Sequence, residues 1–109
     1  MKIALVPLNP VVGDVAGNAA LHVAAIARAR EAGADLVVFP ELSICGYPPK
    51  DLLLAEGFVE ACMAAAKEVG EKHSKGGTAI FGLPLPMDRA TYPPGGPIRN
   101  SLLVYRDCP

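Results

Sequence analysis

Tryptophan is absent from the sequence, aromatic residues make up only 6% of it, and no block of basic residues is present. The 10 Lys and Arg residues are balanced by 11 Asp and Glu residues, which leaves a formal net charge of −1. Proteins that bind a nucleic-acid backbone or an anionic membrane surface concentrate positive charge on one face or segment. The charge pattern therefore predicts that neither nucleic acid nor a membrane is a partner.

Long apolar runs and cysteine frameworks are also missing. No stretch approaches the roughly 18 consecutive apolar residues that a membrane span needs. The apolar start at Met1–Leu8 is interrupted by Pro7 and is too short for a signal peptide. The three cysteines, Cys45, Cys62 and Cys108, are an odd number at spacings that match neither a disulfide framework nor a zinc site. The sequence therefore predicts a protein of the reducing cytoplasm.

Apolar residues, by contrast, are abundant and make up 51% of the 109 positions. This fraction rules out a disordered tail, and the length allows one compact domain with a thin hydrophobic core. Four short segments are apolar at successive positions, as strands are when layers cover both faces of their sheet. The predicted strands are Ile3–Leu8, Leu36–Phe39, Thr78–Leu83 and Ser101–Tyr105.

Two helices are predicted between these strands. The first spans Val15–Ala32, with Asp14 as its N-cap and Gly33 as the left-handed residue that ends it. The second spans Phe58–Lys72, where apolar residues form one stripe and charged residues cluster on the opposite side. One face of this second helix is therefore expected to pack against the rest of the domain.

The order strand, helix, strand, helix, strand, strand predicts an α/β fold with a mostly parallel sheet. Between the last two strands, the segment Pro84–Pro97 holds five of the 11 prolines and is predicted to be a loop. Because no helix carries the chain back, these two strands are expected to be antiparallel neighbours. Before the second helix, Asp51 is expected to cap a short turn over Leu52–Ala55.

Glu41 is the candidate catalytic residue. Sites in open α/β sheets form where the carboxyl ends of the strands meet, and the run Phe39-Pro40-Glu41-Leu42 places this carboxylate directly after the second predicted strand. A rigid and partly buried carboxylate at that position could serve as a general base. The alternative from these residues alone is a carboxylate that is solvated or that caps the next helix.

The loop after this carboxylate combines a glycine turn at Gly46, the aromatic Tyr47 and the stiff pair Pro48-Pro49. The run Phe39–Leu42, followed by Gly46–Leu53, resembles the nitrilase (carbon-nitrogen hydrolase) superfamily, and within it the glutaminase domain of the glutamine-dependent NAD synthetase branch. Further segments similar to that family are Ile3–Pro10, Val12–Asp14, Gly17–Asn18, Ala32–Val38, Gly82–Pro84 and Asn100–Asp107. The resemblance therefore covers nearly the whole chain.

The resemblance implies a fold, a reaction and two site residues. The fold is a four-layer α-β-β-α sandwich, of which this chain would supply part. Nitrilase-type enzymes use a Glu as general base, a Lys that stabilises the tetrahedral intermediate and a Cys nucleophile that forms a thioester. Glu41 matches the Glu, and Tyr47 matches a Tyr that holds the glutamine substrate in the NAD synthetase branch. The implied reaction hydrolyses glutamine to glutamate and ammonia, and a separate ATP-using domain adds the ammonia to nicotinic acid adenine dinucleotide.

The resemblance also implies what residues 1–109 lack. In the family the Lys follows the strand that matches Ser101–Tyr105 and the Cys comes later, so both are expected beyond Pro109. Residues 1–109 are therefore expected to be the N-terminal portion of a glutaminase domain, inactive alone, with the remainder of the parent chain as partner and homo-oligomers in the full-length protein. One sheet face would lack its second sheet and meet water or another chain. ATP and magnesium are expected only in the synthetase domain, and no cofactor or metal is expected in this chain.

The other nucleophilic and metal-ligating side chains offer no substitute. Cys45 lies on the loop after Glu41, but no His or Lys stands beside it in the sequence to lower its pKa. Cys62 falls on the apolar stripe of the second helix and is expected in the core. His22 is expected among apolar neighbours on the first helix, and His73 is expected at a helix end. For these histidines a solvated side chain or an interaction with a helix C-terminus is favoured over metal binding.

The residues leave three functions open. The first is the glutaminase portion of an NAD synthetase, the second is another nitrilase-type amidase or carbamoylase, and the third is a non-catalytic remnant that acts as an interaction domain. The Tyr47–Leu53 run favours the first function over the second. The absent Lys and Cys favour the third function, and the sequence beyond Pro109 would separate it from the other two.

Overall fold

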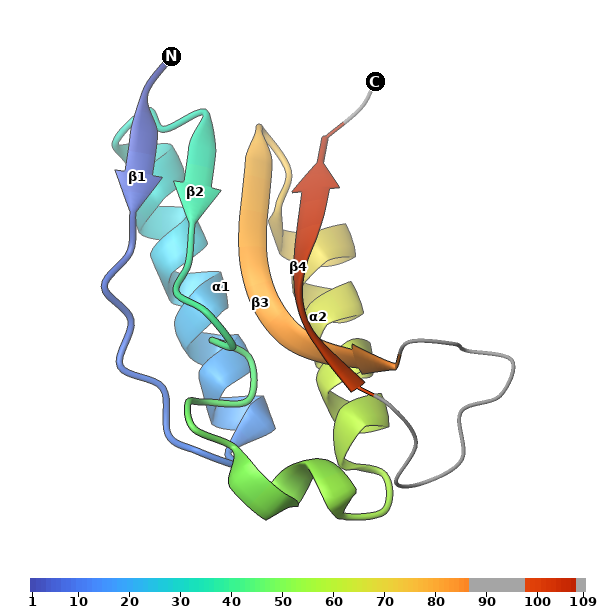
Figure 1. Cartoon of the computed structure of the whole chain (residues 1–109). Coiled ribbons are helices and arrows are strands. Elements are labelled where there is room, and N and C mark those ends of the chain that lie inside the picture. The colour runs from blue at the N-terminus through green and yellow to red at the C-terminus, as the bar shows by residue number, and fades with distance from the viewer. Residues whose placement is uncertain (87–97, 108–109) are drawn as a thin grey trace.

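The computed structural model describes residues 1–86 and 98–107 and contains one four-stranded sheet in the order β1-β2-β3-β4. The first three strands run parallel, and β4 is antiparallel to β3 (Figure 1). This topology confirms the predicted α/β order and the antiparallel final pair. The strands are β1 (Ile3–Leu5), β2 (Leu36–Val38), β3 (Thr78–Pro86) and β4 (Ile98–Arg106).

Two α-helices, α1 (Val15–Glu31) and α2 (Phe58–His73), cover the same face of the sheet (Figure 1). The predicted cap of α1 is confirmed, because the Asp14 carboxylate accepts a hydrogen bond from the Gly17 N–H at 3.0 Å. Gly33 follows the helix with φ +84°, the left-handed conformation that glycine adopts without a steric penalty. Among the described residues, no helix is both long and apolar enough to cross a membrane.

The turn before α2 differs from the prediction. It is a 3-10 helix, η1 (Lys50–Leu54), whose N-cap is Pro49 and which has no side-chain hydrogen bond at its cap. Pro49 already has helical backbone angles, so the turn begins before Asp51. The prediction that Asp51 caps this turn is therefore wrong, and Asp51 lies inside the first turn of η1.

Strand lengths also differ from those predicted. The first strand ends at Leu5 instead of Leu8. The Val6 N–H still donates to the Val38 carbonyl, but the next bond of the pairing would need an N–H at position 40, where Pro40 has none. The third strand continues through Pro84 and Pro86, which were expected in a loop. The Gly82 carbonyl accepts a hydrogen bond from the Ile44 N–H, on the edge of β3 that faces away from β4. Every second residue of a strand presents its backbone N–H and C=O groups to the same edge.

Because Pro84 and Pro86 share this orientation with Gly82, their missing N–H groups remove no bond between β3 and β4. The prolines therefore fit in the strand without weakening its pairing. The rest of the predicted loop, residues 87–97, lies outside the described residues.

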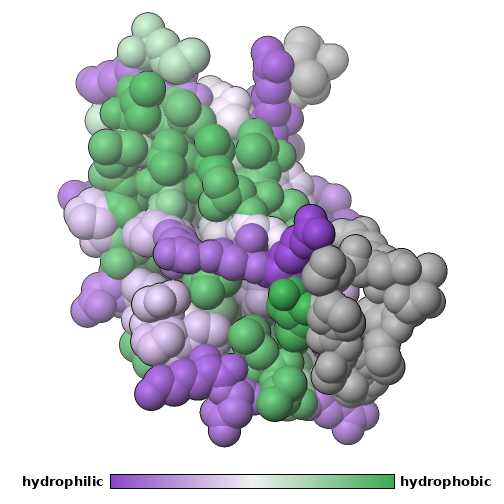
Figure 2. All heavy atoms as spheres, viewed as in Figure 1, coloured by the Kyte–Doolittle hydropathy of each residue, from purple (hydrophilic) through white to green (hydrophobic). Residues whose placement is uncertain are grey.

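The two faces of the sheet have different surroundings. On the helix side, Val37, Phe81 and Leu83 are completely buried and form the centre of the core. Within the described residues, no helix or strand covers the other face, which we call the open face. Its apolar side chains are Ile3, Leu5, Leu36, Val38, Ile80, Leu102 and Val104. Figure 2, drawn from this side, shows hydrophobic surface gathered over the strands.

The open face is strongly exposed, since Leu5 has 75% and Leu102 63% of its surface accessible to solvent. The apolar character of the strands predicted layers on both sides, and the described residues supply only one. A single uncovered face is what the expected partial sandwich would have. The candidate site lies at the edge of this face.

Candidate active site

The chain leaving β2 crosses the open face of β3 at Gly82. A Cβ atom built on Gly82 would lie 2.4 Å from the Leu42 backbone nitrogen, far inside van der Waals contact. Beyond the crossing, the Ile44 N–H donates to the Gly82 carbonyl at 3.1 Å. The absence of a side chain at Gly82 therefore lets the Glu41–Leu42 backbone lie directly on the sheet.

This crossing carries Glu41 from β2 toward β4. The Glu41 carboxylate is exposed, and its Oε1 atom accepts a hydrogen bond from the Asn100 side-chain amide. Asn100 lies on β4 opposite Pro84, two residues from Leu102, and so belongs to the open face. Glu41 is therefore held at the border of the open face, with one carboxylate oxygen engaged by Asn100.

Asn100 did not emerge from the sequence as a partner of Glu41. It lies within the Asn100–Asp107 segment that is similar to the family, but nothing local connects it to a residue 59 positions earlier. The alternation of β4 would have placed Asn100 on the same face as Leu102. Only the pairing of β4 with β3 shows that Asn100 lies opposite Pro84, two residues from the crossing at Gly82.

Tyr47, the predicted substrate-binding residue, is on the same loop and is 64% exposed. The preceding Gly46 has φ +85°, and a Cβ there would lie 2.7 Å from the Val12 Cα, so only glycine fits. The Tyr47–Pro48 peptide bond is cis. In the described residues no hydrogen bond or ring contact joins Tyr47 to Glu41, so the loop alone relates these two side chains.

A buried polar cluster lies beneath this loop. His22 and Asn18 on α1 and Ser43 on the loop each have 0% of their surface exposed. His22 contacts the Ser43 hydroxyl through Nε2 at 2.8 Å, and Asn18 Nδ2 donates to the Ile44 carbonyl at 3.0 Å. His22 lies in the middle of α1 and points at the loop, and its ring packs against Phe39 and Phe81, which confirms the expected apolar neighbourhood and excludes a solvated side chain.

The described cysteines lie in the core and cannot meet a substrate. Cys45 and Cys62 both have 0% exposure, which confirms the prediction that Cys62 is a core residue. The hydrogen bond with Cys45, together with burial, raises the pKa of the Cys62 thiol. Cys45 therefore has no access as a nucleophile, and Cys108 lies outside the described residues.

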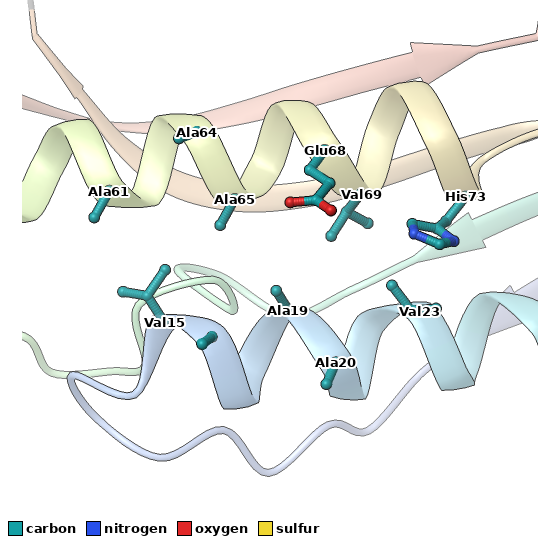
Figure 3. Close-up of a pocket in the computed structure, with 11 residues that line it drawn as sticks. Val15, Ala19, Ala20, Val23, Ala61, Ala64, Ala65, Glu68, Val69 and His73 are labelled. Atoms are coloured by element: carbon teal, nitrogen blue, oxygen red, sulfur yellow. The ribbon is translucent and has the colours of Figure 1, made fainter.

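A groove of about 580 Å³ lies away from this site, between α1 and α2 (Figure 3). Alanine and valine side chains line most of it, and Glu68 and His73 are its two titratable residues. His73 is exposed in the last turn of α2, as expected. No group of three His, Cys, Asp or Glu side chains in residues 1–86 and 98–107 could hold a metal ion.

Comparison with known proteins gives a consistent family. The model of the family described as carbon-nitrogen hydrolase matches residues 2–75. A glutamine-dependent NAD(+) synthetase of Synechocystis is 50% identical over 70 residues, which is 64% of this chain and 12% of that relative. One from Xanthomonas campestris is 37% identical over 109 residues, which is 97% of this chain and 20% of that relative. The chain therefore spans a fifth or less of the length of these curated relatives.

Solved structures agree with this grouping. The glutamine-dependent NAD(+) synthetase of Cytophaga hutchinsonii superimposes with a TM-score of 0.86 at 23% identity, over 98% of this chain and 17% of that one, and so supports the fold. The enzyme of Acinetobacter baumannii gives a TM-score of 0.83 at 30% identity, over 97% and 19%. A Nesterenkonia amidase gives 0.69 at 28%, over 94% and 36%. With the family model matching more than half of its length, the chain belongs to the carbon-nitrogen hydrolase family.

Proposed function

We propose that this chain is part of the glutamine-hydrolysing domain of a glutamine-dependent NAD(+) synthetase and that Glu41 is its general base. The observation that carries the proposal is the Glu41 carboxylate, exposed at the border of the open face and hydrogen-bonded by Asn100. The curated relatives support glutamine as the substrate, because those of Synechocystis and Xanthomonas campestris are both named glutamine-dependent NAD(+) synthetase. The reducing cytoplasm is the compartment we propose for it.

The proposed reaction uses one catalytic residue of this chain, Glu41, together with a Cys and a Lys outside residues 1–109. Glu41 accepts the proton of a Cys thiol, and the resulting thiolate attacks the amide carbon of glutamine. A Lys stabilises the oxyanion, the amide nitrogen takes the proton held by Glu41 and leaves as ammonia, and water then hydrolyses the thioester to glutamate. The Cys and the Lys are proposed to follow Pro109. Asn100 engages one oxygen of Glu41, which leaves the second oxygen to take the proton.

ATP and magnesium have no role in this part of the proposal. Residues 1–86 and 98–107 contain no cluster of metal-ligating side chains. The Lys75-Gly76-Gly77-Thr78 segment lacks the spacing of a phosphate-binding loop. From the resemblance to the family, we propose that a separate domain uses the ammonia with ATP and that residues 1–109 take part only in its supply. The full-length protein is proposed to be a homo-oligomer.

The proposal is tested by following glutamate release from L-glutamine. The full-length protein is expected to release glutamate faster from glutamine than from other amides or carbamoyl compounds. The chain of residues 1–109, assayed alone, is expected to show a rate near background and to associate through its open face, as light scattering would reveal. Preference for another amide would point to a different amidase, and no hydrolysis of any amide by the full-length protein would indicate a non-catalytic domain.

Two results for the short chain would contradict these expectations. Glutaminase activity that Cys45→Ser abolishes would make the buried Cys45 the nucleophile. A monodisperse monomer would show that the open face, with Leu5 and Leu102 exposed, does not drive association.

Replacing Tyr47 by Phe tests the proposed substrate contact. The ring would keep its place on the loop while the hydroxyl group is lost. If that hydroxyl orients glutamine without moving a proton, Tyr47→Phe raises the KM for glutamine more than it lowers kcat. Steady-state kinetics of the full-length protein measure both constants. Unchanged kinetics would leave Tyr47 without a role in binding.

A further inference from the structure

The two ring nitrogens of the buried His22 have different partners. Nδ1 lies 2.7 Å from the Asn18 backbone carbonyl, and Nε2 lies 2.8 Å from the Ser43 hydroxyl oxygen. A carbonyl oxygen can only accept a hydrogen bond, so Nδ1 carries the hydrogen. In the neutral ring, Nε2 then accepts the hydrogen of the Ser43 hydroxyl. In this arrangement both ring nitrogens have a hydrogen-bond partner, and the Ser43 hydroxyl donates its hydrogen to His22.

The surroundings of His22 favour this neutral ring. The ring packs against Phe39 after β2 at a centroid distance of 4.3 Å and against Phe81 on β3 at 5.8 Å. Its hydrogen-bond partners are Asn18 on its own helix and Ser43 on the loop, and neither these two residues nor the two phenylalanines carry a charge. Burial lowers the pKa of His22 below its usual value.

The cluster holds the loop between the two proposed site residues. Ser43 is two positions after Glu41, and Ile44, whose carbonyl accepts from Asn18, is three positions before Tyr47. From the sheet side, the Gly82 carbonyl accepts from the Ile44 N–H. The loop is therefore attached to α1 on one side and to β3 on the other.

We infer that His22, through Ser43, is a positioning residue for Glu41 and Tyr47. The inference rests on the proposed glutaminase function for its kinetic part. His22 touches neither the proposed base nor the open face, so it acts only through the loop. A displacement of about 1 Å in a catalytic group can cost about 100-fold in rate, so a loosened loop is expected to lower glutamine turnover well before the protein unfolds.

Ser43→Ala in the full-length protein is the first test. This substitution removes the hydroxyl group that donates a hydrogen bond to His22 Nε2. As a result, kcat/KM for glutamine is expected to fall about ten- to a hundredfold. Exchange of the Ile44 and Gly46 amide hydrogens is expected to become faster, while turnover with added ammonia stays unchanged. The matched control is Ser74→Ala, which removes another buried hydroxyl, one that donates to the Val69 carbonyl at 3.4 Å near the end of α2. The control should change neither glutamine kinetics nor exchange in the loop.

The double variant His22→Leu/Ser43→Ala separates positioning from simple packing. Replacing both polar partners leaves no buried group unsatisfied, so its Tm is expected to recover relative to Ser43→Ala. If His22 positions the loop, glutamine turnover stays low and exchange at Ile44 stays fast. Recovery of turnover and exchange together with Tm would overturn the inference.

Amide hydrogen exchange tests the positioning role of His22 independently of the proposed glutaminase function. A full-length protein that does not hydrolyse glutamine would refute the glutaminase proposal. Faster exchange at Ile44 in Ser43→Ala, but not in Ser74→Ala, would still support a loop held by His22. Unchanged exchange in Ser43→Ala would refute the positioning role whatever the substrate.

Discussion

Glu41→Gln in the full-length protein is expected to lower glutamine-dependent turnover by about 10²–10⁴-fold, the usual contribution of a general base. Glutamine keeps the length of the side chain, and its carbonyl oxygen can still accept from Asn100. Only the ability to take a proton is lost. Turnover with added ammonia is expected to survive, because ammonia bypasses the hydrolytic step. Parallel assays with glutamine and with ammonia measure the two rates.

The control for this substitution is Glu71→Gln, which removes the charge of an exposed carboxylate on α2. It should leave both rates as they are in the parent protein. Equal glutaminase rates for Glu41→Gln and the parent would remove Glu41 from the reaction. A fall in the ammonia-dependent rate of the same size would mean that the substitution damages the whole protein.

Gly82→Ala is the second substitution with a large expected effect. Its new Cβ would lie 2.4 Å from the Leu42 nitrogen and 3.2 Å from the Glu41 carbonyl carbon, both backbone atoms of the crossing segment. Backbone cannot yield as a flexible side chain does, so the segment must lift from β3. We expect the free energy of unfolding to fall by about 1–3 kcal/mol, which is typical of overpacking. We also expect glutamine turnover to fall, because Glu41 moves away from Asn100.

Gly57→Ala provides the comparison for Gly82→Ala. Gly57 has φ +80°, so alanine there is strained, but nothing lies within 4 Å of its Cβ position. This variant should lose stability without a specific effect on glutamine. Thermal unfolding and glutamine kinetics of the two variants separate general destabilisation from displacement of Glu41. Normal glutamine kinetics in Gly82→Ala would show that the close crossing is not needed.

The features predicted correctly from the sequence are mostly local ones. The Asp14 cap and the Gly33 stop depend on residues within one helical turn, so the limits of α1 were predictable to within one residue. The position of Glu41 after a strand was predictable for the same reason. Asp51 failed as a cap because Pro49, a neighbour with equally local influence, starts the turn first.

The features that the sequence did not predict depend on distant pairing. Pro84 and Pro86 read as loop residues, and they fit in β3 only because their missing N–H groups point away from β4. His22 reads as a residue of an alanine-rich helix, and its partner Ser43 lies 21 positions away. Nothing in the residues around Glu41 specifies Asn100. The resemblance could identify the proposed base, but not the contacts that hold it.

The spacing of these contacts sets an order in which a growing chain can assemble the site. The bond between His22 and Ser43 spans 21 positions, whereas the bond between Asn100 and Glu41 spans 59. Ribosomes add about 5–20 residues per second, so Asn100 is made about 3 to 12 seconds after Glu41. During that interval, α1 and the loop can already associate through a short chain closure. The loop can therefore be seated on its helix before β4 is synthesised, and the carboxylate meets its amide partner last.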